Sequence, residues 1–270
     1  MSSKRALLFA LLVAAAVGAL YLPVRGFDYI HLDDVYYVRD NGLLADGLDL
    51  RSIRTAFSGS YEYFYIPLTW LSYMADVQLS GFSPGAFHST NALLHACAAA
   101  LLFLALYLAT SSTALSLATA LLWAIHPMRV ESVAWITERK DVLAGFFFAA
   151  TLLSYVLYAR RKGFGFLALA TFTGVLALLS KPVAVVLPAT LFLMDFWPLQ
   201  RLPEGGFKEN RRKWLSLAAE KAPLAIFSLA VVYLTLAAHS QSVSRSAGGY
   251  GPLGIMANVG SSYFIYLWHT

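Results

Sequence analysis

The sequence is poor in charge and nearly free of cysteine. Only 13% of its 270 residues are charged and 59% are hydrophobic, whereas a soluble domain carries about 25% charged residues. The single cysteine, Cys97, lies in an apolar run, so an intrachain disulfide and a cysteine-based metal site are excluded. The chain has no Gly-rich phosphate loop, no Ser-His-Asp arrangement, no HExxH motif and no nucleic-acid signature. The low charge and the high apolar content indicate a membrane protein.

Long apolar runs recur along the chain. A hydrocarbon core about 30 Å thick takes about 20 helical residues. We expect seven transmembrane helices and the start of an eighth near residue 257, which makes the chain an all-α polytopic membrane protein with 1–270 as a single integral membrane domain. The seven runs cover 6–22, 91–109, 113–125, 142–159, 164–179, 183–197 and 222–238.

The first run follows Lys4 and Arg5 and is compatible with a signal peptide or an uncleaved anchor. The anchor is favoured because no small-x-small cleavage site follows the run. Both interpretations place the next segment outside the cytoplasm.

Basic residues gather on one side of the expected spans, as the positive-inside rule describes. With the N-terminus in the cytoplasm, the inner segments hold Lys4, Arg5, Arg160, Arg161, Lys162, Arg201, Lys208, Arg211, Arg212, Lys213 and Lys221. Most acidic residues fall on the other side, among them the adjacent pair Asp33-Asp34. The pair is therefore expected on the extracytoplasmic face.

The first outer loop, 23–84, is too long for a simple connector. Asp33-Asp34 lies near its start, and we expect helices over 50–57 and 68–79 that lie along the outer membrane surface. Aromatic residues crowd its second half: Tyr61, Tyr63, Phe64, Tyr65, Trp70 and Tyr73. Such rings favour the headgroup region, so they are expected to anchor the loop.

A second polar stretch runs from His126 to Asp141. His126-Pro127 interrupts a short apolar run, and proline suits the first turn of a new helix. The spacing places Glu131, Trp135 and Glu138 on one helical face. Charges near the hydrocarbon boundary are costly unless paired or hydrated. A solvated loop with local ion pairs and a reaction site both fit, and the cluster as a whole favours the site.

Lys181 lies where two short apolar runs meet, in Ser180-Lys181-Pro182. The two runs hold too many residues for one span, so they are expected to form a hairpin with Lys181 at its outer turn. Lys181 then shares a face with Asp33-Asp34. A lysine that snorkels to the interface and a phosphate contact fit equally well.

Four segments together resemble the membrane half of bacterial tetratricopeptide-repeat membrane proteins. Those are similar to the animal transmembrane and tetratricopeptide-repeat O-mannosyltransferases, within the GT-C superfamily of glycosyltransferases. The segments are HLDDVYYVRDN, YIPLTWLSYMADVQLSGFSPGAFHSTNALLHA, HPMRVESVAWITERKDVLAG and LLSKPVAVVLPATLFLMDFWPL, in this order. Relatives continue into further spans and repeats, so we expect this chain to be an N-terminal fragment of a longer one.

The resemblance implies a glycosyltransferase of a bacterial inner membrane that uses a polyprenyl-phosphate-linked sugar and an extracytoplasmic protein or glycan acceptor. It matches Asp33 and Asp34 to the family's outer-loop carboxylates. The other recurring polar positions match His126, Glu131, Arg139, Lys140, Asp141 and Lys181. Mannose as the sugar and protein Ser/Thr as the acceptor come only from the animal relatives.

The chemistry suits these residue types. A carboxylate can take the proton of the acceptor hydroxyl, and the leaving phosphate needs cations rather than an acid. We predict Asp33 or Asp34 as the base, Arg139, Lys140 and Lys181 as phosphate contacts, and His126 as a positioning group for the acceptor or a metal. Together with Glu131 and Asp141, these six residues make up the predicted site.

Two points stay open at this stage. The adjacent carboxylates are compatible with a divalent cation, which nothing in the sequence requires. A non-catalytic membrane scaffold or lipid-binding module is the alternative from another class. A transporter fits less well, because the charges collect at one face rather than through the bilayer.

Overall fold

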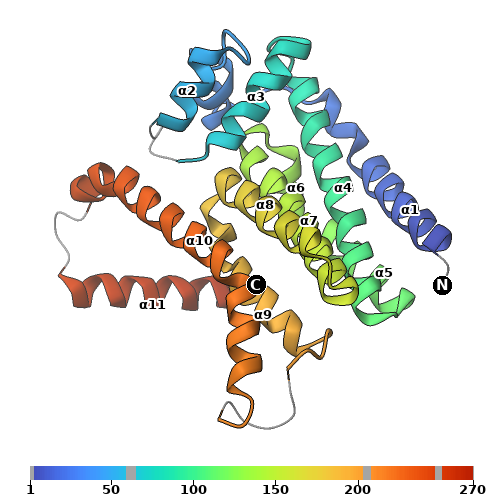
Figure 1. Cartoon of the computed structure of the whole chain (residues 1–270). Coiled ribbons are helices and arrows are strands. Elements are labelled where there is room, and N and C mark those ends of the chain that lie inside the picture. The colour runs from blue at the N-terminus through green and yellow to red at the C-terminus, as the bar shows by residue number, and fades with distance from the viewer. Residues whose placement is uncertain (1–2, 59–64, 203–207, 247–250, 270) are drawn as a thin grey trace.

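The computed structural model describes residues 3–58, 65–202, 208–246 and 251–269, and all regular structure within them is helical (Figure 1). The segment before α4, which the sequence predicts as the outer loop and which keeps that name here, contains η1 (Leu22–Gly26), η2 (Val35–Arg39), α2 (Leu50–Ser58) and α3 (Pro67–Ser80). The bundle contains α1 (Ser3–Tyr21), α4 (Pro84–Thr110), α5 (Thr113–Ile125), α6 (Arg129–Ala134), η3 (Ile136–Glu138), α7 (Arg139–Arg161), α8 (Phe164–Ser180), η4 (Pro182–Val186), α9 (Leu187–Phe196) and α10 (Arg211–Ser246), and α11 (Pro252–His269) follows α10.

Within the described residues, four segments are long and apolar enough to cross a membrane: Lys4–Gly26, Pro84–Thr110, Ile136–Arg161 and Arg211–Ala237. The other expected runs form shorter apolar helices, Thr113–Ile125, Phe164–Ser180, Pro182–Phe196 and Leu253–Ile265. Every apolar run predicted from the sequence is therefore helical. The chain is an all-α polytopic integral membrane protein.

Helix boundaries follow from local chemistry. α4 begins at Pro84, where the missing N–H of proline loses no helical hydrogen bond. The helix ends where Ser111 turns into the left-handed region at φ 61°, and the Ser111 N–H caps the Tyr107 carbonyl at 2.8 Å. α7 ends in the same way at Lys162, after two arginines in its last turn, where positive charge complements the helix dipole.

α4 lies between α1 and α7, and α7 packs along α8 (Figure 1). Small side chains on α4, Ala92, Ala96 and Ala99, are buried against α1. Such residues let helix backbones approach closely within a membrane. Farther along the chain, Gly174 on α8 leaves room for Leu224 of α10.

The two ends of the bundle differ in charge. The start of α1, at Ala6 and Leu7, shares one end with Arg160 and Arg161 at the end of α7. The opposite end carries η1, whose Arg25 carbonyl lies against Gly85 at the start of α4. The start of α7 lies there too, because Arg139 donates to the Phe87 carbonyl near the start of α4 at 3.0 Å, and Lys181 pairs with Asp141 in the first turn of α7. This arrangement agrees with the alternation expected from the positions of the basic residues.

The outer loop has a hydrophobic core of its own, in which two of the predicted anchor residues are buried. The predicted helices over 50–57 and 68–79 are present as α2 and α3. The anchoring role predicted for Trp70 and Tyr73 is wrong, because each ring is only 1% exposed in a core that also contains Phe87 and Ile136. The Tyr73 hydroxyl donates to the Ile136 carbonyl at 2.8 Å and holds the ring inside. Tyr61, Tyr63 and Phe64 lie outside the described residues.

The polar stretch after His126 is not one continuous helix. α6 ends at Ala134, Trp135 is extended at φ −94° and ψ 123°, and η3 follows. The Asn91 side-chain amide of α4 donates to the Trp135 carbonyl at 3.0 Å, which stabilises this break. The expectation that Glu131 and Glu138 share one helical face is therefore wrong.

A buried ionic cluster joins α7, α9 and α10 at the end of the bundle that carries Arg160 and Arg161, called the basic end below. Asp195, which is fully buried, binds Arg201 at 2.9 Å and also pairs with Lys221. Arg201 binds Glu220 at 2.8 Å, and the Tyr155 hydroxyl donates to Asp195 at 2.8 Å. Two acids and two bases thus form a charge-balanced cluster, as buried ions require.

Candidate functional site

The structure separates the two adjacent aspartates. Asp34 is fully buried, and its Oδ2 accepts a hydrogen bond from the Ile30 N–H at 3.0 Å. Its Oδ1 accepts from the Thr137 N–H at 2.9 Å and from the Thr137 hydroxyl. Asp34 therefore ties the outer loop to η3, which leads directly into α7.

Asp33 is exposed, and among the described residues no side chain or N–H binds its carboxylate. The loop around it is acidic. Burial, with the Asp34 and Asp28 charges as further causes, raises the pKa of Tyr29 to about 12. Tyr29 consequently stays protonated and donates to the Phe82 carbonyl at 2.9 Å. Of the pair, only Asp33 is accessible to a substrate.

An ionic chain starts next to the Asp34–Thr137 contact. Lys140 donates to the Thr137 carbonyl at 3.1 Å and pairs with Glu138 at 2.8 Å. Glu138 also lies 3.5 Å from the Lys181 ammonium, which in addition pairs with Asp141. The Ser132 hydroxyl of α6 donates to Asp141 at 3.2 Å. Segments far apart in sequence thus bring Asp34, Lys140, Asp141 and Lys181 together.

The predicted role of Arg139 as a phosphate contact does not fit its surroundings. Its side chain has no exposed surface and binds Asp76 at 2.6 Å. It also donates to the Phe87 carbonyl at 3.0 Å and to the Asn91 side chain. Arg139 therefore holds α3 and α4 against the start of α7, and a phosphate cannot reach it.

His126 and Glu131 lie on the exposed surface around α6. His126 Nδ1 accepts from the Met128 N–H at 3.2 Å and closes the turn that begins α6. No described residue pairs with the Glu131 carboxylate. Both side chains are accessible, and their predicted substrate contacts stay predictions.

A cavity of about 440 Å³ runs beside the ionic chain along α7. Its polar end holds Asp141 and Arg129, and the Arg129 guanidinium lies 4.9 Å from the centre of the Trp123 ring. The rest of the lining is mostly apolar: Leu102, Ala144, Gly145, Phe148, Ala149, Leu152, Val183, Ala184 and Val186. An apolar cavity with charged groups at one end suits an amphiphile with an ionic head.

Three residues of the candidate site were not predicted from the sequence: Arg129, Thr137 and Glu138. Arg129 and Glu138 carry charge within the polar stretch, so their residue types were a usable signal. Thr137 gave none, because its role depends on the approach of Asp34 from 103 residues earlier in the chain.

The carboxylate pair does not fit a divalent cation. Asp34 uses both oxygens to accept hydrogen bonds from Ile30 and Thr137, so the pair cannot supply the several free oxygens that such a cation takes. Across the part of the chain that the structure describes, no three His, Cys, Asp or Glu side chains gather as metal ligands.

These features define a helical membrane protein with a charged site at one end of its bundle and an apolar cavity beside it. Comparisons with known proteins relate the chain to protein O-mannosyl-transferases. It is 31% identical over 209 residues to protein O-mannosyl-transferase TMTC1 of Mus musculus, covering 70% of this chain and 22% of that protein. It is 30% identical over 161 residues to TMTC2 of Homo sapiens, covering 57% of this chain and 19% of that protein.

The similarity extends to Tmtc1 of Drosophila melanogaster, at 31% identity over 180 residues, 64% of this chain and 21% of that protein. The matches span about a fifth of the length of these relatives. No protein-family profile and no solved structure matches the chain. The resemblance to the animal O-mannosyltransferases, inferred from the four sequence segments, is confirmed.

Proposed function

We propose that this chain is the membrane part of a GT-C type glycosyltransferase. It moves a sugar from a polyprenyl-phosphate carrier to a hydroxyl of an extracytoplasmic acceptor. The names of the relatives, protein O-mannosyl-transferases, support mannose as the sugar and protein as the acceptor. The site then faces the outside of a bacterial inner membrane, and the basic end of the bundle faces the cytoplasm.

One observation supports the proposal most: an accessible carboxylate, two lysines in an ionic chain and an apolar cavity all lie toward one end of the bundle. Asp33 adjoins Asp34, which is fixed to Thr137, and the Lys140–Glu138–Lys181 chain begins at Thr137. Asp141, which belongs to the same series of ion pairs, lines the cavity. A carrier lipid has an apolar tail and a phosphate head, which match these two parts.

The burial and the contacts of the candidate residues support a more specific assignment of roles than the sequence did. Asp33, not Asp34, is the base, because Asp34 is buried and engaged by three donors. Lys181, which is 28% exposed, and Arg129 at the head of the cavity are the phosphate contacts. Lys140 supports them through Glu138. Arg139 has a purely structural role.

The reaction follows from these positions. Asp33 accepts the acceptor O–H proton while the acceptor oxygen bonds to the anomeric carbon of the sugar. The bond from that carbon to the phosphate oxygen breaks, and polyprenyl phosphate leaves with the electron pair. Lys181 and Arg129 stabilise the charge that grows on the phosphate, which is worth most where water is scarce.

The proposal is tested by transfer of radiolabelled mannose from polyprenyl-phosphate mannose to an acceptor, in liposomes that contain the chain. Asp33→Asn should abolish transfer, because the amide cannot take the proton. Asp46→Asn is the matched control, since Asp46 is exposed on the same loop and loses the same charge. Full transfer by Asp33→Asn would remove Asp33 from the chemistry. No transfer by the wild-type chain would favour the scaffold instead.

A further inference from the structure

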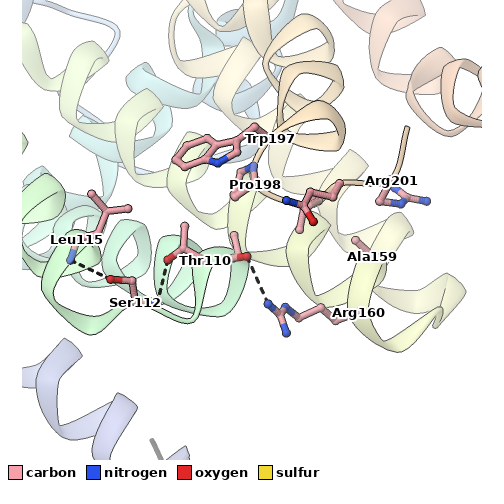
Figure 2. Close-up of a pocket in the computed structure, with 11 residues that line it drawn as sticks. Thr110, Ser112, Leu115, Ala159, Arg160, Trp197, Pro198 and Arg201 are labelled. Atoms are coloured by element: carbon pink, nitrogen blue, oxygen red, sulfur yellow. Dashed lines mark hydrogen bonds between the residues drawn. The ribbon is translucent and has the colours of Figure 1, made fainter. Parts of the chain in front are cut away.

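A second cavity lies at the basic end of the bundle, away from the proposed transfer site. Its volume is about 620 Å³, within the range of about 300–1,000 Å³ typical of ligand pockets. The turn between α4 and α5, the end of α7 and the segment after α9 form its walls (Figure 2). None of its lining residues takes part in the transfer site, so it needs an explanation of its own.

Arg160 brings a cation to this cavity from the last turn of α7. It is exposed and donates one N–H to the Ala109 carbonyl at 3.3 Å (Figure 2). Among the described residues no carboxylate lies within ion-pair distance of Arg160. Asp195 and Glu220, at the same end, are bound to Arg201 and Lys221. The positive charge is thus left for an external anion, and the guanidinium fork matches the geometry of a phosphate.

Neutral polar groups surround the arginine. The Ser112 hydroxyl accepts from the Leu115 N–H at 3.4 Å, so its own proton is available for donation. Thr110 and the Gln200 amide add further polar groups to the wall. The Arg201 guanidinium is bound to the ionic cluster and points away from Trp197 (Figure 2). The Thr110 hydroxyl donates to the Leu106 carbonyl at 2.8 Å, which leaves the Ser112 hydroxyl and the Gln200 amide as neutral donors. One cation with two neutral donors suits an anion of low charge.

The rim of the cavity is apolar. Trp197 is 58% exposed and Leu115 is 47% exposed, and both lie beside the polar lining. Tryptophan favours the level of the lipid headgroups. Basic pockets between transmembrane helices on the cytoplasmic side bind anionic headgroups. A free phosphate in water would make no use of these two side chains.

We propose that this cavity is a binding site for an anionic phospholipid of the inner leaflet. Arg160 holds the lipid phosphate, and Trp197 and Leu115 contact the glycerol and the upper acyl chain. This site is separate from the transfer site and does not depend on the activity proposed above.

The test counts lipids bound to the purified chain by native mass spectrometry, with phosphatidylglycerol and phosphatidylcholine of identical acyl chains. The wild-type chain should retain phosphatidylglycerol preferentially. Arg160→Gln should weaken this binding about fivefold or more, whereas Lys162→Gln should change it less than about twofold. Lys162 is an exposed base two residues further on that does not line the cavity, so it controls for nonspecific charge.

Three results would overturn the proposal. The first is equal retention of the two lipids, and the second is equal loss in Arg160→Gln and Lys162→Gln. The third is displacement of the bound lipid by millimolar inorganic phosphate, which would identify the ligand as free phosphate. Arg160→Lys keeps the charge without the fork and should restore part of the preference. Unchanged thermal midpoints of the variants show that the fold is intact.

Discussion

Replacing Asp34 by Asn tests whether this aspartate holds the fold together rather than performing the chemistry. The carboxylate accepts hydrogen bonds from Ile30 and from two donors of Thr137 while it is fully buried. An asparagine keeps one oxygen for Thr137 but turns its NH₂ group toward the Ile30 N–H. One charge-assisted bond, worth about 1.5–3 kcal/mol, is lost and the other two become neutral, so we expect a loss of about 2–4 kcal/mol.

The assay is the thermal unfolding midpoint of the chain in detergent. A loss of that size should lower the midpoint by roughly 5–15 °C. Asp46→Asn, an exposed substitution on the same loop, should stay within about 0.5 kcal/mol of wild type. Asp34→Asn combined with Thr137→Val should destabilise less than the sum of the single changes, because they remove the same contact. An Asp34→Asn chain as stable as wild type would refute the structural role.

Three further perturbations follow from the packing. Arg139→Met leaves Asp76 buried without its partner and should cost about 3–5 kcal/mol, and adding Asp76→Leu should recover part of the loss in chemical denaturation. Gly145→Leu fills open space in the apolar cavity and should raise the KM for the lipid donor. Gly165→Leu, at an exposed position on α8, should leave this KM unchanged. Equal effects of the two variants would show that the cavity does not bind the donor. Gly85→Ala places a methyl group 2.6 Å from a backbone oxygen of η1 and should lower stability by about 1–3 kcal/mol, and an unchanged unfolding midpoint would contradict this close approach.

The helical architecture could be predicted because hydrophobic runs and proline positions are local signals. Each apolar run became a helix, and His126-Pro127 marks the start of a new one. Hydropathy did not indicate how far each helix extends across the bilayer. In the described ranges only four helices are long and apolar enough to cross a membrane. The position of the shorter helices depends on packing against their neighbours, which hydropathy does not report.

The candidate site was predictable by residue type but not by partner. The sequence grouped Lys140, Asp141 and Lys181, and the structure brings them into one ionic chain. It could not distinguish Asp33 from Asp34, since only tertiary contacts with Thr137 bury one of them. Arg139 and Lys140 received the same predicted role because both are basic, yet the Arg139 side chain is buried and binds Asp76.

The ionic cluster that joins α7, α9 and α10 has a consequence for biogenesis. Asp195 emerges from the ribosome 26 residues before Lys221, its partner on α10. Arg201 follows Asp195 by only six residues, but the buried carboxylate gains its second cation only when α10 is in place. We therefore expect α9 to reach its final depth together with α10. Insertion of this part of the chain then finishes with α9 and α10 docking together, as a late and concerted step of assembly.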